Sequence, residues 1–125
     1  MKTITRSIAG LILLTTFAVV AQAQNPAVRM KAGPPPELIS YTLQNLRLAA
    51  ITVGTVELQI FDAKTCRRLC GSRSVLNKKI DPCKTLDGQI RCPAPPPPAP
   101  SGYIYFLRVR NTGGTVMTEN WLYVP

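Results

Sequence analysis

All four cysteines of this 125-residue chain lie in one short stretch, at positions 66, 70, 83 and 92. Disulfides constrain a fold strongly, because each one requires two backbone positions to lie within a few ångströms of each other. Strand-like segments flank this stretch on both sides, so we expect a positively charged, disulfide-tied loop excursion on a small β domain. We call the stretch the basic block (residues 64–92), after its eight basic residues: Lys64, Arg67, Arg68, Arg73, Lys78, Lys79, Lys84 and Arg91.

The spacing of the cysteines favours two disulfides over a metal site. Cys66 and Cys70 form a C-x3-C pair and Cys83 and Cys92 a C-x8-C pair, whereas tetrahedral zinc sites typically use C-x2-C pairs. The lack of a C-x-x-C motif in the sequence also argues against thiol redox catalysis. Three pairings are open. We favour a nested arrangement, Cys66–Cys92 with Cys70–Cys83, and a local arrangement, Cys66–Cys70 with Cys83–Cys92, is a close second.

Residues 1–23 have the three parts of a secretory signal peptide. Lys2 and Arg6 supply positive charge, residues 8–20 form an apolar run, and Ala21 and Ala23 match the small-x-small rule of signal peptidase. The apolar run is too short to cross a bilayer core of roughly 30 Å. We therefore expect cleavage after Ala23 and a secreted or periplasmic mature protein, in which disulfides persist.

The mature chain would be strongly basic. Removing Lys2 and Arg6 from the fifteen basic residues leaves thirteen against six acidic ones, a net charge of +7. The partner is unknown, but this charge favours an anionic polysaccharide, a membrane surface or a protein, with nucleic acid the least favoured for an exported chain. The alternative is that the charges form a solvated face. The candidates for anion binding are Lys64, Arg67, Arg68, Arg73, Lys78, Lys79 and Lys84.

The mature chain is expected to fold as one domain. Residues 24–37 contain three consecutive prolines and predict a flexible lead-in, followed by a single β-sandwich domain at residues 38–125. Apolar side chains in residues 38–53 recur at both helical and strand spacing, and the β-branched and aromatic residues near the start favour a strand. Gly54 is expected in a turn.

Three further segments predict strands. The clearest signal is the alternation of Val56, Leu58 and Ile60 with polar side chains, as in a half-buried strand. Residues 73–80 predict another strand, and residues 103–124 a closing hairpin around a glycine turn.

Turns and loops separate these strands. The dipeptides at residues 81–82 and 87–88, Asp-Pro and Asp-Gly, predict turns. Residues 93–100 consist of six prolines and two alanines and are expected to form a stiff spacer.

The last strand poses a choice for two aromatic residues. Trp121 and Tyr123 share one face of it with Glu119. If this face is exposed, the two rings are candidates for stacking on sugar rings. If it is buried, they belong to the core, which is the reading that the alternation favours.

The closing hairpin also carries a family resemblance. Residues 103–125 resemble the closing hairpin of immunoglobulin-like accessory domains in family 2 glycoside hydrolases, where an apolar strand and a Gly turn precede Ser/Thr-x-Asn-aromatic-x-aromatic. Thr118, Asn120, Trp121 and Tyr123 match this pattern. The resemblance implies an Ig-like fold and transfers no catalytic motif. The expected fold class is therefore mainly β, a small antiparallel β-sandwich.

The composition argues against catalysis. The chain has no histidine, which removes Ser-His-Asp sites, histidine metal ligands and the usual general base. No glycine-rich phosphate loop is present in the sequence, so we expect no enzyme activity, cofactor or metal. We predict an exported, non-enzymatic binding or structural module that contacts an anionic envelope or extracellular partner through the basic block. The alternative is a secreted cationic effector, either a membrane-active protein or an enzyme inhibitor.

Overall fold

The computed structural model describes residues 2–3, 5–6 and 26–125 of the chain. Two short strands near the N-terminus, β1 (Lys2–Thr3) and β2 (Thr5–Arg6), pair in parallel. The predicted signal peptide otherwise lies outside the described residues, as does its cleavage site. Among the residues that are described, no helix has the length and hydropathy needed to cross a membrane.

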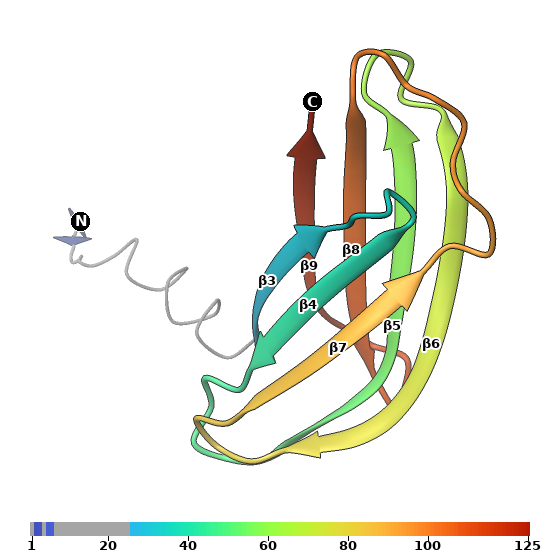
Figure 1. Cartoon of the computed structure of the whole chain (residues 1–125). Helices are drawn as coiled ribbons and strands as arrows, with labels where there is room; N and C mark the ends of the chain where they lie inside the picture. The colour runs from blue at the N-terminus through green and yellow to red at the C-terminus, as the bar shows by residue number, and fades with distance from the viewer. Residues whose placement is uncertain (1, 4, 7–25) are drawn as a thin grey trace.

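Two antiparallel sheets pack face to face, which confirms the predicted sandwich (Figure 1). The first sheet has the strand order β3 (Ala27–Ala32), β4 (Leu38–Gln44), β7 (Thr85–Arg91). The second has the order β6 (Arg68–Ile80), β5 (Ile51–Asp62), β8 (Tyr103–Asn111), β9 (Val116–Val124). The strands of the three-stranded sheet cross obliquely over the longer strands of the other, as twisted sheets do when they pack.

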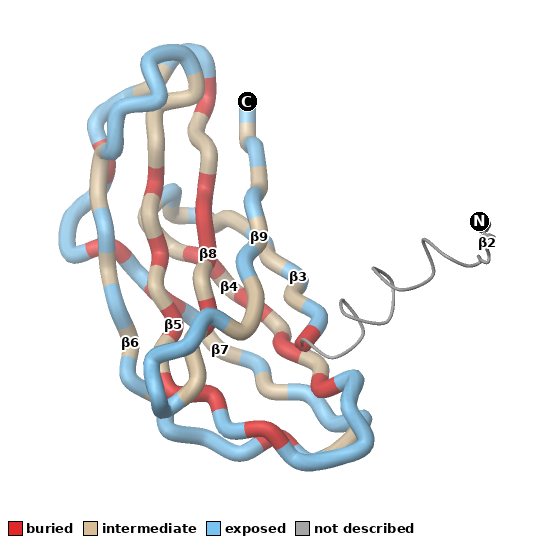
Figure 2. The backbone as a smooth tube through the Cα atoms, turned by 180° about the vertical axis from the view of Figure 1, so that it is seen from behind, coloured by how far each residue is buried: buried red, intermediate tan, exposed pale blue. Residues whose placement is uncertain are grey.

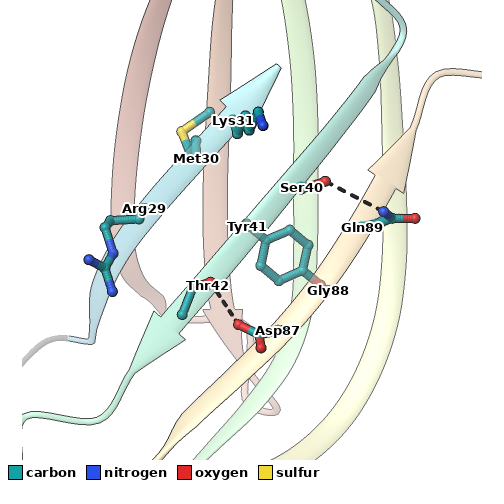
Figure 3. A pocket seen from close by; sticks show the side chains of 9 residues that line it. All are labelled: Arg29, Met30, Lys31, Ser40, Tyr41, Thr42, Asp87, Gly88 and Gln89. Carbon is teal, nitrogen blue, oxygen red and sulfur yellow. Dashed lines mark hydrogen bonds between the residues drawn. The ribbon is translucent and has the colours of Figure 1, made fainter. Parts of the chain in front are cut away.

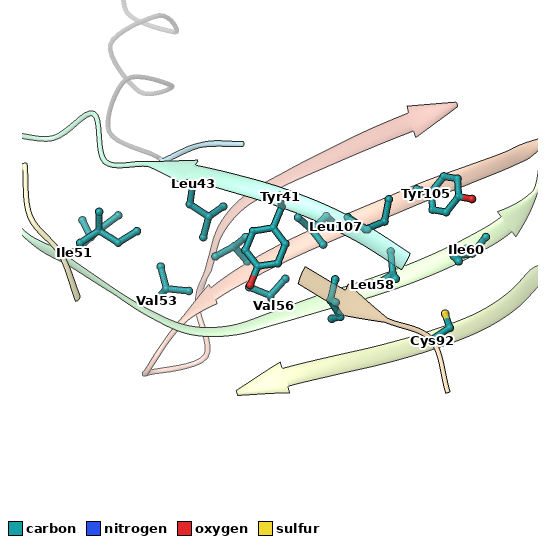
Figure 4. Close-up of a cluster of buried hydrophobic side chains, with 14 residues drawn as sticks. Tyr41, Leu43, Ile51, Val53, Val56, Leu58, Ile60, Cys92, Tyr105 and Leu107 are labelled. Atoms are coloured by element: carbon teal, nitrogen blue, oxygen red, sulfur yellow. The ribbon is translucent and has the colours of Figure 1, made fainter. Parts of the chain in front are cut away.

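The core lies between the sheets and follows the alternation of apolar side chains (Figures 2 and 4). Each central strand contributes every second residue, because successive side chains of a strand point to opposite faces. The predicted alternation in residues 56–60 is confirmed. Buried side chains of this pattern include Ile39, Tyr41 and Leu43 of β4, Val56, Leu58 and Ile60 of β5, and Tyr105, Leu107 and Val109 of β8.

The strand boundaries differ from the prediction in two places. β3 lies inside residues 24–37, which were expected to be a flexible lead-in, and it pairs along its whole length with β4. Residues 38–53 do not form one continuous strand, because residues 45–50 separate β4 from β5.

The expected turn at Gly54 is wrong for a physical reason. Gly54 lies inside β5, at a shift in register with both β6 and β8. A Cβ atom at this position would lie 2.5 Å from the carbonyl oxygen of Asn111. Glycine is therefore required by a close approach of two backbones and not by a turn.

The basic block is also more regular than a loop excursion. It supplies β6, an edge strand of the four-stranded sheet, and β7, an edge strand of the three-stranded sheet. A disulfide joins Cys70 of β6 to Cys92, which follows β7, so it links the two sheets. Cys66 and Cys83 are exposed free thiols. Both favoured pairings are therefore wrong.

Distance explains why the other two cysteines do not pair. Cys66 precedes β6 and Cys83 follows it. A strand of this length spans on the order of 40 Å at about 3.3 Å per residue. A disulfide needs Cα atoms within about 7 Å of each other, so no second bond forms within one chain.

Alkylation of the folded, unreduced protein should label Cys66 and Cys83 and leave Cys70 and Cys92 unmodified, as peptide mapping would reveal.

Replacing Cys70 and Cys92 by alanine should lower the free energy of unfolding by about 3 kcal/mol, because the bond closes a loop of moderate length. The matched control is the Cys66→Ser/Cys83→Ser variant, which should unfold at nearly the wild-type denaturant concentration. Labelling of Cys70 or Cys92 before reduction would contradict this pairing.

Asn45 is the one polar residue in the buried core of the described chain, and it ties three segments together. Its side-chain Nδ2 donates to the carbonyl oxygens of Ala49 and Ile80, both at 2.9 Å. Its Oδ1 accepts from the backbone N–H of Arg47 at 2.8 Å. Asn45 therefore holds the loop after β4 against the end of β6, a role that no pattern in the sequence indicates.

Replacing Asn45 by alanine should cost about 2–3 kcal/mol of stability, because it leaves the carbonyl of Ile80 buried without this donor and opens a small cavity. Urea titration of the variant would measure the loss. Gln44→Ala is the control, since Gln44 precedes Asn45 and points away from the core. A loss below about 1 kcal/mol for Asn45→Ala would mean that water replaces the amide at little cost.

Candidate functional site

The solvent-facing side of the four-stranded sheet brings charged and aromatic side chains together. Residues paired across adjacent strands point to the same face of a sheet. The register thus arranges this side, which we call the outer face, in three rows that run across the strands. They are the ion-pair row Arg73, Glu57, Arg108, Glu119, the aromatic row Gly71, Gln59, Phe106, Trp121, and the end row Arg68, Phe61, Ile104, Tyr123.

The ion-pair row alternates positive and negative charge. Nε of Arg108 lies 2.6 Å from a carboxylate oxygen of Glu119, and its guanidinium also lies 4.0 Å from Glu57. Arg110 approaches the other oxygen of Glu57 at 3.4 Å. These pairs are half-buried and still reach solvent, and pairs of this kind stabilise a fold by on the order of 1 kcal/mol each. Their larger effect here is that both carboxylates of the outer face are already paired.

The aromatic row holds the indole of Trp121 in place. The ring centroids of Trp121 and Phe106 lie 4.2 Å apart, and the ring of Phe61 approaches the indole edge-on at 6.0 Å. The guanidinium carbon of Arg108 also lies over the Phe106 ring, 5.0 Å from the ring centroid. Phe106 is consequently buried although it points outward, while Trp121 remains 58% exposed.

Tyr123 is the second exposed ring of this face. It is 57% exposed, and its hydroxyl donates to the carbonyl oxygen of Ser101 at 3.0 Å. The favoured expectation that Trp121 and Tyr123 belong to the core is therefore wrong. The alternation of the strand was interpreted correctly, but β9 points these side chains to solvent, because Leu122 and Val124 pack against the core instead.

At the β6 end of the aromatic row, the lack of a side chain at Gly71 leaves a shallow hollow of about 440 Å³. Arg68 and Arg73 flank this hollow, and Glu57, Leu58, Gln59 and Ser72 complete its lining. A Cβ atom at Gly71 would meet a guanidinium nitrogen of Arg68 at 3.4 Å. Two guanidinium groups thus border a concave, polar part of the sheet.

The structure separates the seven predicted anion-binding residues into three groups. Arg68 and Arg73 lie at the hollow. Lys64 and Arg67 lie in the turn that precedes β6, while Lys78, Lys79 and Lys84 lie at its far end. The basic block is therefore a charged edge and not a compact cluster. Within the described part of the chain, Lys79 contacts Asp81 at 3.9 Å, whereas Arg68, Arg73 and Lys78 form no ion pair.

Asp62 orders the turn that carries Lys64 and Arg67. Its Oδ1 accepts hydrogen bonds from the backbone N–H groups of Lys64 at 2.8 Å and Thr65 at 3.2 Å. These two bonds lower the pKa of Asp62 below its ordinary value. Their contribution to stability is present above the unfolded-state pKa and is lost as the pH falls through the lowered value.

A second concavity, of about 670 Å³, opens on the solvent-facing side of the three-stranded sheet (Figure 3). Thr42 donates to Asp87 at 2.7 Å, and Gln89 donates to Ser40 at 3.5 Å, so its polar groups largely bind one another. Arg29 adds positive charge at one side. We find no exposed aromatic ring there to hold a ligand, since Tyr41 is almost completely buried.

Tyr41 also explains why the predicted turn at residues 87–88 is wrong. Both residues lie inside β7, where Gly88 pairs with Tyr41. The Tyr41 ring occupies the space that a side chain at position 88 would need. Burial of the ring raises the pKa of the Tyr41 hydroxyl above its ordinary value.

The carboxylates are dispersed over the described residues. No group of three or more histidine, cysteine, aspartate or glutamate side chains comes together there to hold a metal ion. Glu57 and Glu119 belong to the ion-pair row, Glu37 contacts Arg91 at 3.3 Å, and Asp87 accepts from Thr42.

Comparisons with known proteins show the fold. No protein-family model matches the sequence, and no similar sequence is found among curated proteins. The structure is similar to part of an exo-chitosanase from Amycolatopsis orientalis, with a TM-score of 0.54 and 8% identity over 81% of this chain. It is also similar to part of β-glucuronidase 2 from Bacteroides uniformis, with a TM-score of 0.54 and 13% identity over 80% of this chain.

These similarities confirm the resemblance to domains of family 2 glycoside hydrolases at the level of the fold. The chain spans only 11% of the chitosanase and 13% of the Bacteroides enzyme. The likeness is therefore to one domain of a much larger enzyme.

Fluorescence can test the exposure of the aromatic row directly, because Trp121 is the only tryptophan in the sequence. Its emission in the folded protein should be strongly quenched by acrylamide, at a substantial fraction of the efficiency found for a free tryptophan derivative. Phe106→Ala should increase this quenching, since it removes the ring against which the indole packs. Weak quenching of the wild-type protein would contradict the placement of Trp121 on the surface.

Proposed function

We propose that the protein is an exported, non-enzymatic binding module that holds an anionic polysaccharide through the positively charged edge formed by β6. The observation that carries the proposal is the distribution of ion pairs. The carboxylates of the outer face are bound to Arg108 and Arg110. Within the described residues, Arg68, Arg73 and Lys78 of β6 form no ion pair and are left to attract a ligand. Guanidinium groups suit this role because they bind carboxylate or sulfate oxygens in pairs.

The length of the charged edge supports a polymer over a small ion. Lys64 and Arg67 lie at one end of β6 and Lys78 and Lys79 at the other, a span of about 40 Å at 3.3 Å per residue. Charges spread along a line bind a linear polyanion with affinity that falls steeply with salt, because each contact releases a counterion. The competing explanation is that basic residues on an edge strand prevent pairing with other chains.

Retention on immobilised polygalacturonate across a salt series separates these explanations. The test variant is Arg68→Gln/Arg73→Gln/Lys78→Gln, and the matched control is Arg29→Gln/Lys31→Gln/Arg47→Gln, which removes the same charge from other exposed positions. We expect the wild type and the control to elute at similar salt concentrations and the β6 variant to bind at least about tenfold more weakly, or about 1.4 kcal/mol.

Two outcomes would overturn the proposal. Equal loss of retention in both triple variants would mean that net charge alone attracts the matrix. Elution of the wild type at low salt, together with both variants, would mean that the basic residues only protect the edge of the sheet. Leakage of anionic vesicles by the wild-type protein would instead favour a cationic effector.

A further inference from the structure

We infer that the outer face contains a subsite for an extended acidic sugar chain, which crosses the strands along the aromatic row. In this subsite a pyranose ring packs on Trp121, and a carboxylate of the same chain binds Arg68 and Arg73 beside Gly71. The inference rests on the proposed function, since it names the place and orientation in which an anionic polysaccharide binds.

The ring proposed to stack on the sugar, Trp121, is already held in position. Phe106 and Phe61 both pack against the indole of Trp121, and the hydrogen bond to Ser101 orients Tyr123. Aromatic faces carry partial negative charge and attract the C–H groups on the flat side of a sugar ring. A ring that is held before binding loses little conformational entropy when the ligand arrives.

The aromatic row also carries groups that can bind the polar parts of a sugar chain. Gly71 provides a hollow, and Gln59 provides an amide that can bind sugar hydroxyl groups. Within the described residues, neither Arg68 nor Arg73 forms an ion pair, so both guanidinium groups are available to a carboxylate. Apolar, hydroxyl-binding and anion-binding groups thus follow one another across the sheet.

The outer face favours a narrow ligand over a broad one. A protein partner on this flat face would also cover the ion-pair row and remove water from Arg108 and its carboxylates, which is costly for charged groups. Charged residues are accordingly depleted at the centres of protein interfaces. A single sugar chain on the aromatic row contacts only Arg73 of the ion-pair row, and it leaves Arg108 and its two carboxylate partners in contact with water.

Geometry also sets a minimum length for the ligand. Gly71 and Trp121 are separated by three strand spacings, or about 14 Å at 4.8 Å per spacing. One pyranose ring is much shorter than this span. A monomer can therefore occupy only one end of the subsite, and an oligomer of several linked rings is needed to engage both ends.

The test uses galacturonic acid and its linear oligomers from trimer to hexamer, with methyl-esterified oligomers of the same length as uncharged controls. Emission from Trp121 should change with the acidic oligomers at concentrations where the monomer and the esterified oligomers have no effect. Calorimetry should give the same order of affinity, and it remains usable in variants without tryptophan.

Gly71→Val is the decisive variant, because it fills the hollow and leaves every charge in place. A Cβ atom at Gly71 has ordinary contacts, and valine is favoured in strands, so the variant should fold. We expect it to bind the hexamer at least about tenfold more weakly, a loss of about 1.4 kcal/mol. It should keep most of its retention on polygalacturonate, since its charged edge is unchanged. Trp121→Ala should weaken hexamer binding similarly, whereas Lys78→Gln/Lys79→Gln should have a much smaller effect.

The result that would overturn the inference is wild-type affinity for the hexamer in both Gly71→Val and Trp121→Ala. If retention on the polymer still depended on Arg68, Arg73 and Lys78, the proposed function would stand with a purely electrostatic mode of binding. If the wild type failed to bind the polymer at all, both proposals would fail. A change in Trp121 emission with anionic vesicles but not with oligomers would also exclude the sugar subsite.

Discussion

The register of β5 with its two neighbours is the constraint on which the outer face depends. β5 pairs with β6 on one side and with β8 on the other, and its buried residues Val56, Leu58 and Ile60 determine which residues face outward. A shift of one residue would expose these apolar side chains and bury Glu57, which is strongly unfavourable. The core therefore fixes the alignment of Gly71, Gln59, Phe106 and Trp121 across the sheet, although none of them forms the centre of the core.

Patterns within one strand were predictable, and relations between distant segments were not. The alternation around Leu58 predicted β5, and the glycine turn predicted the closing hairpin. Gly54 and Gly88 looked like turn residues, but each is required by a neighbour from another strand, Asn111 in one case and Tyr41 in the other. A single sequence does not show which strands lie next to each other in the sheet. These two glycines were therefore interpreted as turn residues, which is the commoner local role of glycine.

The same limit applies to the disulfide and to the aromatic residues. The spacing of the cysteines favoured a nested or a local pairing, and neither occurs. Cys66 and Cys83 lie far apart because β6 is one long strand, which the sequence only partly indicated. For Trp121, alternation gave the two faces of β9 correctly, but it was taken to favour burial of the face that is exposed in the structure. The burial of Phe106 beneath the indole of Trp121 could not be deduced either, because it requires the pairing of β8 with β9.

The disulfide links the stability of the fold to the geometry of the candidate subsite. β6 is an edge strand, and edge strands have hydrogen-bonded neighbours on one side only, so their ends separate more easily than central strands. Cys70 immediately precedes Gly71 and is bonded to Cys92, which is almost completely buried next to the other sheet. The bond therefore holds β6 at the point where the hollow lies. Arg68 and Arg73 are two and three residues from this anchor, close enough for their backbone positions to depend on it. In an oxidising compartment, where such a bond persists, the charged end of the aromatic row would keep its alignment with Trp121 without support from a further strand.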